Sequence, residues 1–210
     1  MATPPSRDPI PNTILDKDPH QLAADTRRRV LEAALSLQSQ EGRYDSGGTA
    51  YPQLRGTTPA QAVDRFLVLL QDRLPGWLRE LHGLMDVAGK GDVSGNLLPV
   101  ARAAIDYYAE VQAAALPAFV SPSVTVRFRQ ALRENELGPD TELRPLAAYL
   151  GAEQERGRVP TSVNPVAVAR LLLAGCFRHA FYEMFVGPDV GPTRDEAARE
   201  IVTELRLSAV

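Results

Sequence analysis

The stretch GPDTELRPLAAYLGAEQERGRVPTSVNPVAVARLLLAGCFRHAFYEMFVG, residues 138–187, decides the fold class. It contains two apolar runs separated by a polar connection, and each run is long enough for a helix of several turns. Asn164 followed by Pro165 is a typical start of the second helix, because asparagine caps free backbone N–H groups and proline fits the first helical turn. Gly187 is a typical stop. This part of the chain therefore predicts two long helices.

Start signals of the same kind recur on both sides of this stretch. Ser121-Pro122 pairs a capping residue with a proline. Thr193 and Glu196 have the spacing of a capping box. Apolar residues follow each start at helical spacing, and no alternating pattern predicts a strand. We therefore expect an all-α fold, with helices at 59–74, 76–88, 96–119, 122–136, 141–156, 165–186 and 193–207.

The composition is typical of a folded protein outside any membrane. Hydrophobic residues make up 44% of the 210, which is enough for a core, and the net charge is −3. No apolar run reaches the length of about 18 residues that a membrane span needs, and the N-terminus does not resemble a signal peptide. The single cysteine, Cys176, lies in an apolar run and fits a reducing compartment. We expect a cytoplasmic protein without a membrane partner.

Three regions of the chain differ in composition. Residues 1–19 contain five prolines and few large apolar groups, so we expect a disordered arm. Residues 20–57 begin with one helical pattern that ends before Gly42 and continue as a long connection with paired glycines at 47–48. Residues 58–210 hold the remaining helices, and we expect them to form the main domain.

Two segments resemble the TetR family of transcriptional regulators. The stretch 138–187 resembles the last two long helices of that family, including their polar connection, and TRRRVLEAALSL at 26–37 looks like its first helix. The resemblance touches most of residues 26–187. It implies that 58–210 form an effector-binding and dimerisation domain, that 20–57 are a remnant of the N-terminal DNA-binding domain, and that the protein is a homodimer.

The recognition unit of that family is not evident in this sequence. A helix-turn-helix needs a helix that enters the major groove, and residues 38–57 show no pattern for one. Residues 1–45 carry six positive and seven negative side chains, which is not the charge of a DNA-binding surface. We expect a ligand-sensing regulator that does not read DNA by itself. The alternative is an ordinary TetR-type repressor with a divergent helix-turn-helix in 38–57.

The expected remnant of the DNA-binding domain contains one basic cluster. In the family, the leading arginines of the first helix lie near the DNA backbone, and the matching residues are Arg27, Arg28 and Arg29. They are weak candidates for phosphate contact. A solvated helix face is the competing interpretation, and we favour it.

Aromatic side chains gather in the middle helices. Such residues combine apolar area with a few polar groups, as small-molecule pockets do, although plain core packing gives the same composition. Because TetR-type regulators bind effectors within these helices, the resemblance implies a pocket for a small apolar or aromatic effector. The candidate ligand-binding residues are Trp77, His82, Met85, Tyr107, Tyr108, Phe119 and Phe128.

The two helices of the opening stretch are apolar over a wide arc, more than an isolated chain would bury easily. In the family they form a four-helix interface around a twofold axis. The candidate interface residues are Leu146, Tyr149, Leu150, Leu172, Leu173, Phe177, Ala180, Phe181 and Met184.

Nothing in the sequence predicts catalysis. The histidines at positions 20, 82 and 179 lack the spacing of a metal site, and no nucleophile elbow or phosphate-binding glycine loop is present. We therefore expect no enzymatic activity, no cofactor, no catalytic residue and no metal. An enzyme on a helical scaffold, with its site around His82 or His179, is the remaining alternative.

Overall fold

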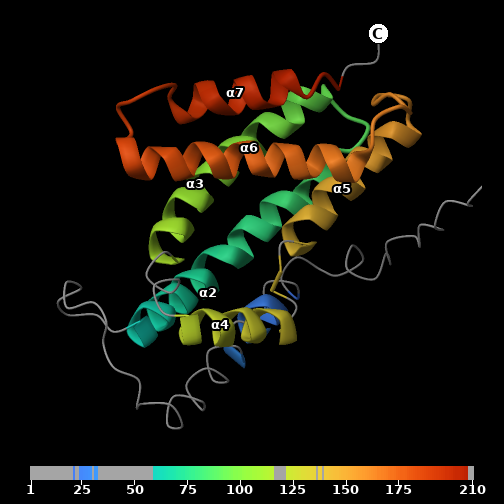
Figure 1. Ribbon diagram of the computed structural model, residues 1–210. Helices are drawn as coiled ribbons and strands as arrows, with labels where there is room; N and C mark the ends of the chain where they lie inside the picture. Colours follow the sequence, from blue (N-terminus) through green and yellow to red (C-terminus); the bar gives the residue numbers. More distant parts are fainter. Residues whose placement is uncertain are drawn as a thin grey trace, which may run out of the picture.

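The computed structural model describes residues 21, 24–29, 31–32, 59–115, 122–135, 137–138 and 140–207, and every regular element in these ranges is helical (Figure 1). The prediction of an all-α fold is therefore confirmed. The main elements are α2 (Pro59–Gly83), the short 3₁₀ helix η2 (Leu84–Val87), α3 (Val93–Ala115), α4 (Pro122–Glu134), α5 (Asp140–Glu155), α6 (Pro165–Val186) and α7 (Arg194–Glu204). The expected disordered arm, 1–19, and the connection 38–57 lie outside the described residues.

The capping signals act where the sequence predicts them. The Asn164 side chain accepts hydrogen bonds from the backbone N–H groups of Val166 and Ala167, at 3.1 and 3.2 Å, and so starts α6. Thr193 and Glu196 form a reciprocal capping box at the start of α7. Both contacts are local in sequence, which is why they could be predicted without the fold.

The predicted break near Pro75 is wrong, because α2 continues through this proline to Gly83. A proline inside a helix costs about 3 kcal/mol, since it removes a backbone hydrogen bond and crowds the preceding turn. Here Leu74, Trp77 and Leu78 are all buried on either side of it. Burial of each large apolar side chain contributes about 1.5–3 kcal/mol, and their sum outweighs the local penalty.

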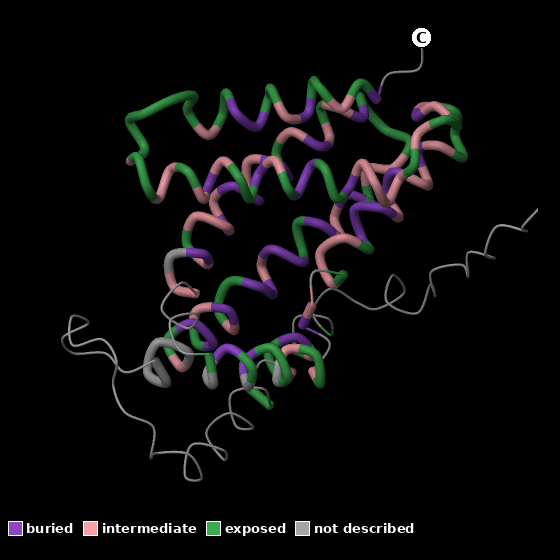
Figure 2. Tube along the Cα trace, in the orientation of Figure 1, coloured by how far each residue is buried: buried purple, intermediate pink, exposed green. Residues whose placement is uncertain are grey.

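The central helix is α3, which packs against α2, α6 and α7. Four of its residues, Leu97, Ala101, Ala104 and Ile105, are completely buried. In Figure 1, α6 and α7 lie side by side at one end and α4 lies at the other, with α2, α3 and α5 between them. Figure 2 shows that the buried residues of these helices face one another, so one core runs through the bundle.

The first helix is described only in part, over residues 24–29 and 31–32. Thr26 within it is fully buried, so this helix packs against other parts of the protein. Among the described helices, none has the length and apolarity that a bilayer crossing requires.

Candidate functional site

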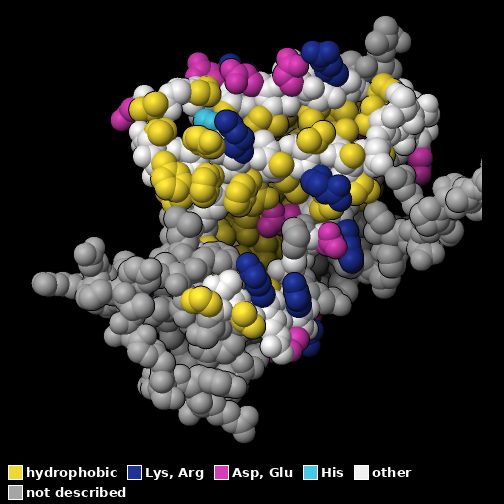
Figure 3. All heavy atoms as spheres, in the orientation of Figure 1, with side chains coloured by type: hydrophobic (Ala, Val, Ile, Leu, Met, Phe, Trp, Pro, Cys, Tyr) yellow, Lys and Arg dark blue, Asp and Glu magenta, His cyan; other side chains and the backbone are white. Residues whose placement is uncertain are grey.

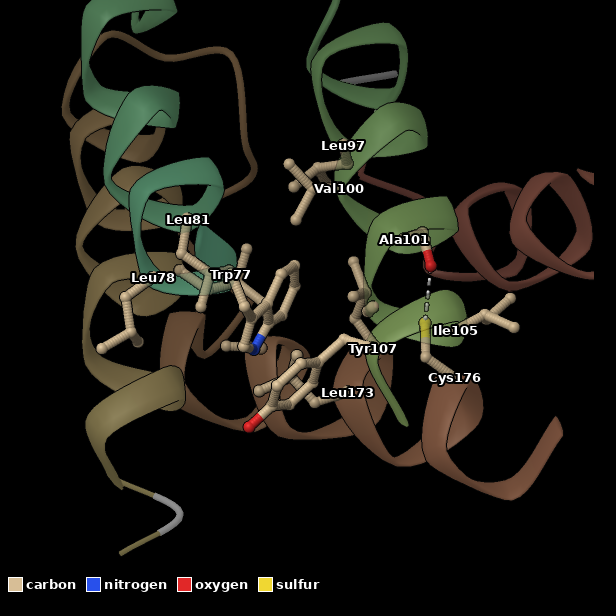
Figure 4. Close-up of a cluster of buried hydrophobic side chains, with 14 of the residues drawn as sticks. Trp77, Leu78, Leu81, Leu97, Val100, Ala101, Ile105, Tyr107, Leu173 and Cys176 are labelled. Carbon is tan, nitrogen blue, oxygen red and sulfur yellow. Dashed lines mark hydrogen bonds between the residues drawn. The ribbon is translucent and has the colours of Figure 1, made fainter. Parts of the chain in front are cut away.

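Trp77 of α2 and two consecutive tyrosines of α3 form the centre of the candidate site. The rings of Trp77 and Tyr107 are stacked, with centroids 5.6 Å apart (Figure 4). The Tyr108 ring lies 5.4 Å from Tyr107 and 5.6 Å from Phe177 of α6. Three helices therefore contribute to one continuous aromatic cluster, defined here as Trp77, Tyr107, Tyr108 and Phe177.

A carboxyl group from α5 reaches this aromatic cluster. The Tyr108 hydroxyl donates a hydrogen bond to the Glu142 carboxylate. Burial raises the pKa of Glu142, and hydrogen bonding from Tyr108 and from the nearby Trp77 indole only partly opposes that rise. Burial likewise raises the pKa of Tyr108, and the adjacent Glu142 charge raises it further. Tyr108 therefore stays a neutral donor at any physiological pH.

Two buried side-chain atoms, one on Trp77 and one on Gln112 a helical turn after Tyr108, lack a hydrogen-bond partner of good geometry. Trp77 is only 4% exposed, and its indole N–H makes no hydrogen bond of good geometry even though it lies close enough to Glu142 to affect that pKa. Gln112 is 8% exposed; its amide N–H₂ donates to the backbone carbonyl of Phe177 at 3.1 Å, but its side-chain oxygen is unpaired. An unpaired buried polar atom costs about 1–3 kcal/mol, so such atoms mark places where a further group can bind.

Another acid on α5, Glu153, is compensated differently. Glu153 is fully buried, and its carboxylate accepts a hydrogen bond from the backbone N–H of Gly89 at 3.0 Å. Arg158 Nε lies 2.9 Å from the other carboxylate oxygen, at ion-pair distance but without good hydrogen-bond geometry. Within the part of the chain that the structure describes, Glu142 forms no ion pair; Tyr108 donates a hydrogen bond to it and the Trp77 indole lies close by. The fold itself therefore compensates the charge of Glu153.

The structure separates the other predicted ligand-binding residues from this centre. His82 is partly buried near the end of α2, where burial lowers its pKa, and Met85 is exposed on η2. Phe128 of α4 packs edge-on against Phe66, with centroids 5.1 Å apart, as part of the core. Phe119 lies outside the described residues. Of the seven candidates, Trp77, Tyr107 and Tyr108 come together directly.

Sequence reasoning missed Glu142 and Gln112. Positions 142, 146, 149 and 153 repeat at helical spacing, so both acids of this series lie on the same face as Leu146 and Tyr149. An acid on the apolar face of a helix is rarely buried without a reason. That signal was present in the sequence, whereas the contact of Gln112 with Phe177 depends on how α3 and α6 cross.

Most of the predicted interface residues face the core of their own chain. Six are buried within the single chain, namely Leu146, Tyr149, Leu150, Leu172, Leu173 and Ala180. They pack where α5 and α6 meet each other and α3. Phe177 is exposed, and Phe181 and Met184 are partly exposed.

The exposed side of α6 carries a different set of large apolar groups. We call it the α6 face and define it by Leu171, Tyr182, Phe185 and Val186. Figure 3 shows hydrophobic side chains along α6 on the face in view. The same figure shows a hollow between α6 and α4 that is floored by hydrophobic side chains and has an acidic side chain beside it.

A charged groove of about 610 Å³ lies between the end of α6, the start of α7 and Arg102 of α3. Arg194 is bound there by both Glu183 and Asp106, with Arg194 Nη1 2.5 Å from an Asp106 oxygen. The hydrogen bond from Arg194 lowers the pKa of Glu183, and Glu183 in turn raises that of Arg194. Because these charges compensate one another, this groove is a structural ion cluster and a weaker candidate for a site.

The arginine cluster of the first helix lies at the protein surface in part. Arg27 and Arg28 are exposed, and Arg28 is bonded to Asp25 at 3.0 Å within the same helix. Among the described residues, no group of three or more His, Cys, Asp and Glu side chains is arranged to hold a metal ion.

Comparison with known proteins yields no match among protein-family models, curated proteins or solved structures. The function therefore has to be argued from the site itself.

Proposed function

We propose that the protein is a ligand-sensing homodimer of the TetR-like type, which takes part in transcriptional regulation without reading DNA by itself. The observation that carries the proposal is the aromatic cluster with its adjoining carboxyl and two unpaired buried polar atoms. A fully satisfied core would not leave Trp77 Nε1 and Gln112 Oε1 without a hydrogen bond of good geometry. A small aromatic effector would pack against the exposed Phe177 ring and the partly exposed Tyr108, and its polar groups would pair with those atoms.

The α6 face supports the dimeric part of the proposal. Leu171 and Phe185 are 63% and 65% exposed and lie on the same side of one helix. Exposed apolar patches of this kind are typical of protein interfaces. A second copy of the chain would cover the patch with an equivalent one around a twofold axis.

Solution mass tests the dimer directly. We expect the wild-type protein to have twice the chain mass of 22.9 kDa by light scattering. Leu171→Glu and Phe185→Glu should each shift it to a single chain, because a charge in an apolar interface is strongly unfavourable. Val126→Glu, at a residue 62% exposed on α4, is the matched control and should leave the mass unchanged. A wild-type protein that stays a single chain at high concentration would contradict the dimer.

Two further measurements test the sensor and the DNA parts. Native mass spectrometry of the purified protein should detect a bound small molecule. An electrophoretic shift assay with the promoter of its own gene should show no specific, salt-resistant complex. Such a complex would favour the ordinary repressor with its recognition unit in 38–57.

A further inference from the structure

The charge of Glu142 is the least compensated feature of the candidate site. Tyr108 and the Trp77 indole offer it neutral donors only, and within the described structure no Lys, Arg or His forms an ion pair with it. Its counterpart Glu153 has Arg158 at 2.9 Å. The two acids belong to one face of α5, so the difference in their described ion pairs comes from the residues around each acid and not from the helix itself.

The groups around Glu142 are suited to positive charge. Aromatic faces carry negative electrostatic potential and attract cations, most strongly for tryptophan. Trp77, Tyr107, Tyr108 and Phe177 supply four rings in edge-on, tilted and stacked contacts from 5.4 to 6.5 Å. Phe177 is exposed and Tyr108 and Glu142 are partly exposed, so a ligand can approach the carboxyl along α6.

We propose that the aromatic cluster binds an organic cation, a protonated amine or quaternary ammonium group on an aromatic body, with Glu142 as its counter-ion. This inference rests on the proposed function, because it names the chemical class of the effector for the same site. The cationic group lies against the Glu142 carboxylate and the aromatic faces. The unpaired Gln112 oxygen accepts a hydrogen bond from an ammonium N–H where the ligand has one. An anionic effector is disfavoured, since it would meet Glu142 without a compensating cation.

The pH dependence follows from the groups that face Glu142. These are Tyr107 and Tyr108 from α3 and Trp77 from α2, while Cys176 of α6 acts on Tyr108. Burial raises the pKa of both tyrosines, and that of Cys176 to about 12, so all three stay neutral. Glu142 is the group that ionises, and a bound cation favours its charged form. Cation binding should therefore strengthen as the pH rises, with release of a proton from Glu142.

A matched series of small compounds tests the inference. The probes are 4-phenylbutylamine, 4-phenylbutanol and 4-phenylbutyrate, which share one aromatic body and differ in charge. The chain has a single tryptophan, Trp77, so its fluorescence reports on the site directly. We expect the amine to bind about tenfold more tightly than the alcohol at pH 7, and the butyrate to bind most weakly.

Two variants distinguish the contribution of the positive charge to binding from the contribution of burying an aromatic ring. Glu142→Gln should remove the preference for the amine and its pH dependence while leaving the affinity for the alcohol within about twofold. Tyr108→Phe should lower the affinity for all three compounds to a similar degree, and the amine should still bind most tightly. Glu155→Gln, at an exposed position of the same helix, is the control and should behave as the wild type.

Each outcome bears on a stated part of the proposal. Binding of the alcohol or the butyrate as tightly as the amine would overturn the cation inference and leave ligand sensing intact. A preference for the amine that persists in Glu142→Gln would overturn the role of Glu142. If none of the three compounds changes the fluorescence up to about 5 mM, the inference fails and the site loses its support as a sensor.

Discussion

Glu142 and Glu153 lie on the same helix, about three turns apart, and differ in what compensates their charge. Arg158 and a backbone N–H hold Glu153, whereas the described residues around Glu142 are neutral donors, Tyr108 and the Trp77 indole. A buried ion pair contributes little net stability, but a buried acid without a cation weakens the fold whenever it is ionised. The acid that we propose as the counter-ion of a ligand is therefore the one that the described fold does not pair with a cation.

The free energy of unfolding should depend on pH because of Glu142. Burial raises the pKa of Glu142 above its unfolded value near 4.5, so the folded state holds this proton to higher pH. The protonated Glu142 therefore contributes stability at a pH below its unfolded pKa, and this contribution is lost as the pH rises through its folded pKa. The loss is about 1.4 kcal/mol for each unit by which the folded pKa exceeds the unfolded one. Glu142→Gln cannot titrate, so its stability relative to the wild type should increase with pH.

Urea unfolding at intervals between about pH 5 and pH 8 measures this difference directly. Other titrating groups are common to both proteins and cancel when the two curves are subtracted. Glu155→Gln serves as the control and should stay parallel to the wild type. A stability difference for Glu142→Gln that is constant over the whole range would contradict the raised pKa.

At the scale of single helices, two glycines in helix interiors differ in their surroundings. A Cβ at Gly151 of α5 would meet nothing within 4 Å, whereas a Cβ at Gly175 of α6 would lie 3.2 to 3.3 Å from three atoms of Ile201. Gly175 therefore allows α6 and α7 to approach closely, while Gly151 has no such role within one chain. Both glycines weaken their helices by about 0.5–1 kcal/mol relative to alanine.

Substitution by alanine should separate the two positions. Gly151→Ala should raise the free energy of unfolding by about 0.5–1 kcal/mol, because it gains helix propensity without a clash. Gly175→Ala gains the same propensity but displaces Ile201, a branched side chain with little freedom to move, so it should be less stable than Gly151→Ala by at least about 1 kcal/mol. Chemical denaturation of both variants measures their free energies of unfolding. Equal values would contradict the prediction, because they would show that α7 shifts away from the new methyl group without loss of stability.

At the scale of the whole molecule, the ion cluster at the start of α7 joins three helices that are distant in sequence. Arg194 of α7 binds Glu183 of α6 and Asp106 of α3. Arg102 of α3 binds Asp106 and Asp195, each at 2.5 Å. Burial alone would raise the pKa of Asp106, but hydrogen bonds from both arginines lower it below its usual value. The cluster therefore holds α7 against the core at neutral pH.

Arg194→Met should lower the free energy of unfolding at pH 7 by about 1–2 kcal/mol, after allowing for the partial solvent exposure of these groups. The pKa values of Glu183 and Asp106 are lowered, so the stability they contribute is present above their unfolded values near 4 and is lost as the pH falls through the folded ones. The penalty of the variant should therefore shrink in acid. Arg79→Met, at an exposed position on α2, is the control. A penalty that is unchanged in acid would mean that the loss comes from packing.

Local signals made much of the fold predictable. Asn164 and the Thr193 capping box start their helices through contacts within three residues, which any fold would allow. The start of α3 was placed three residues late, because Asp92, whose carboxylate accepts from the Gly95 N–H at 2.8 Å, was not recognised as a cap. The stacked pair of Trp77 and Tyr107 was within the predicted set, but the sequence did not distinguish it from Phe128, which belongs to the core.

The sequence by itself determined the helical class and most helix starts, because capping and periodicity act over a few neighbouring residues. Tertiary structure decided which apolar face is buried and which acid is paired with a cation. Leu146, Tyr149 and Leu172 are buried in their own chain, and Glu142 meets Trp77 and Tyr108 only because α2, α3 and α5 converge. Those contacts join residues tens of positions apart, and their geometry depends on how whole helices cross.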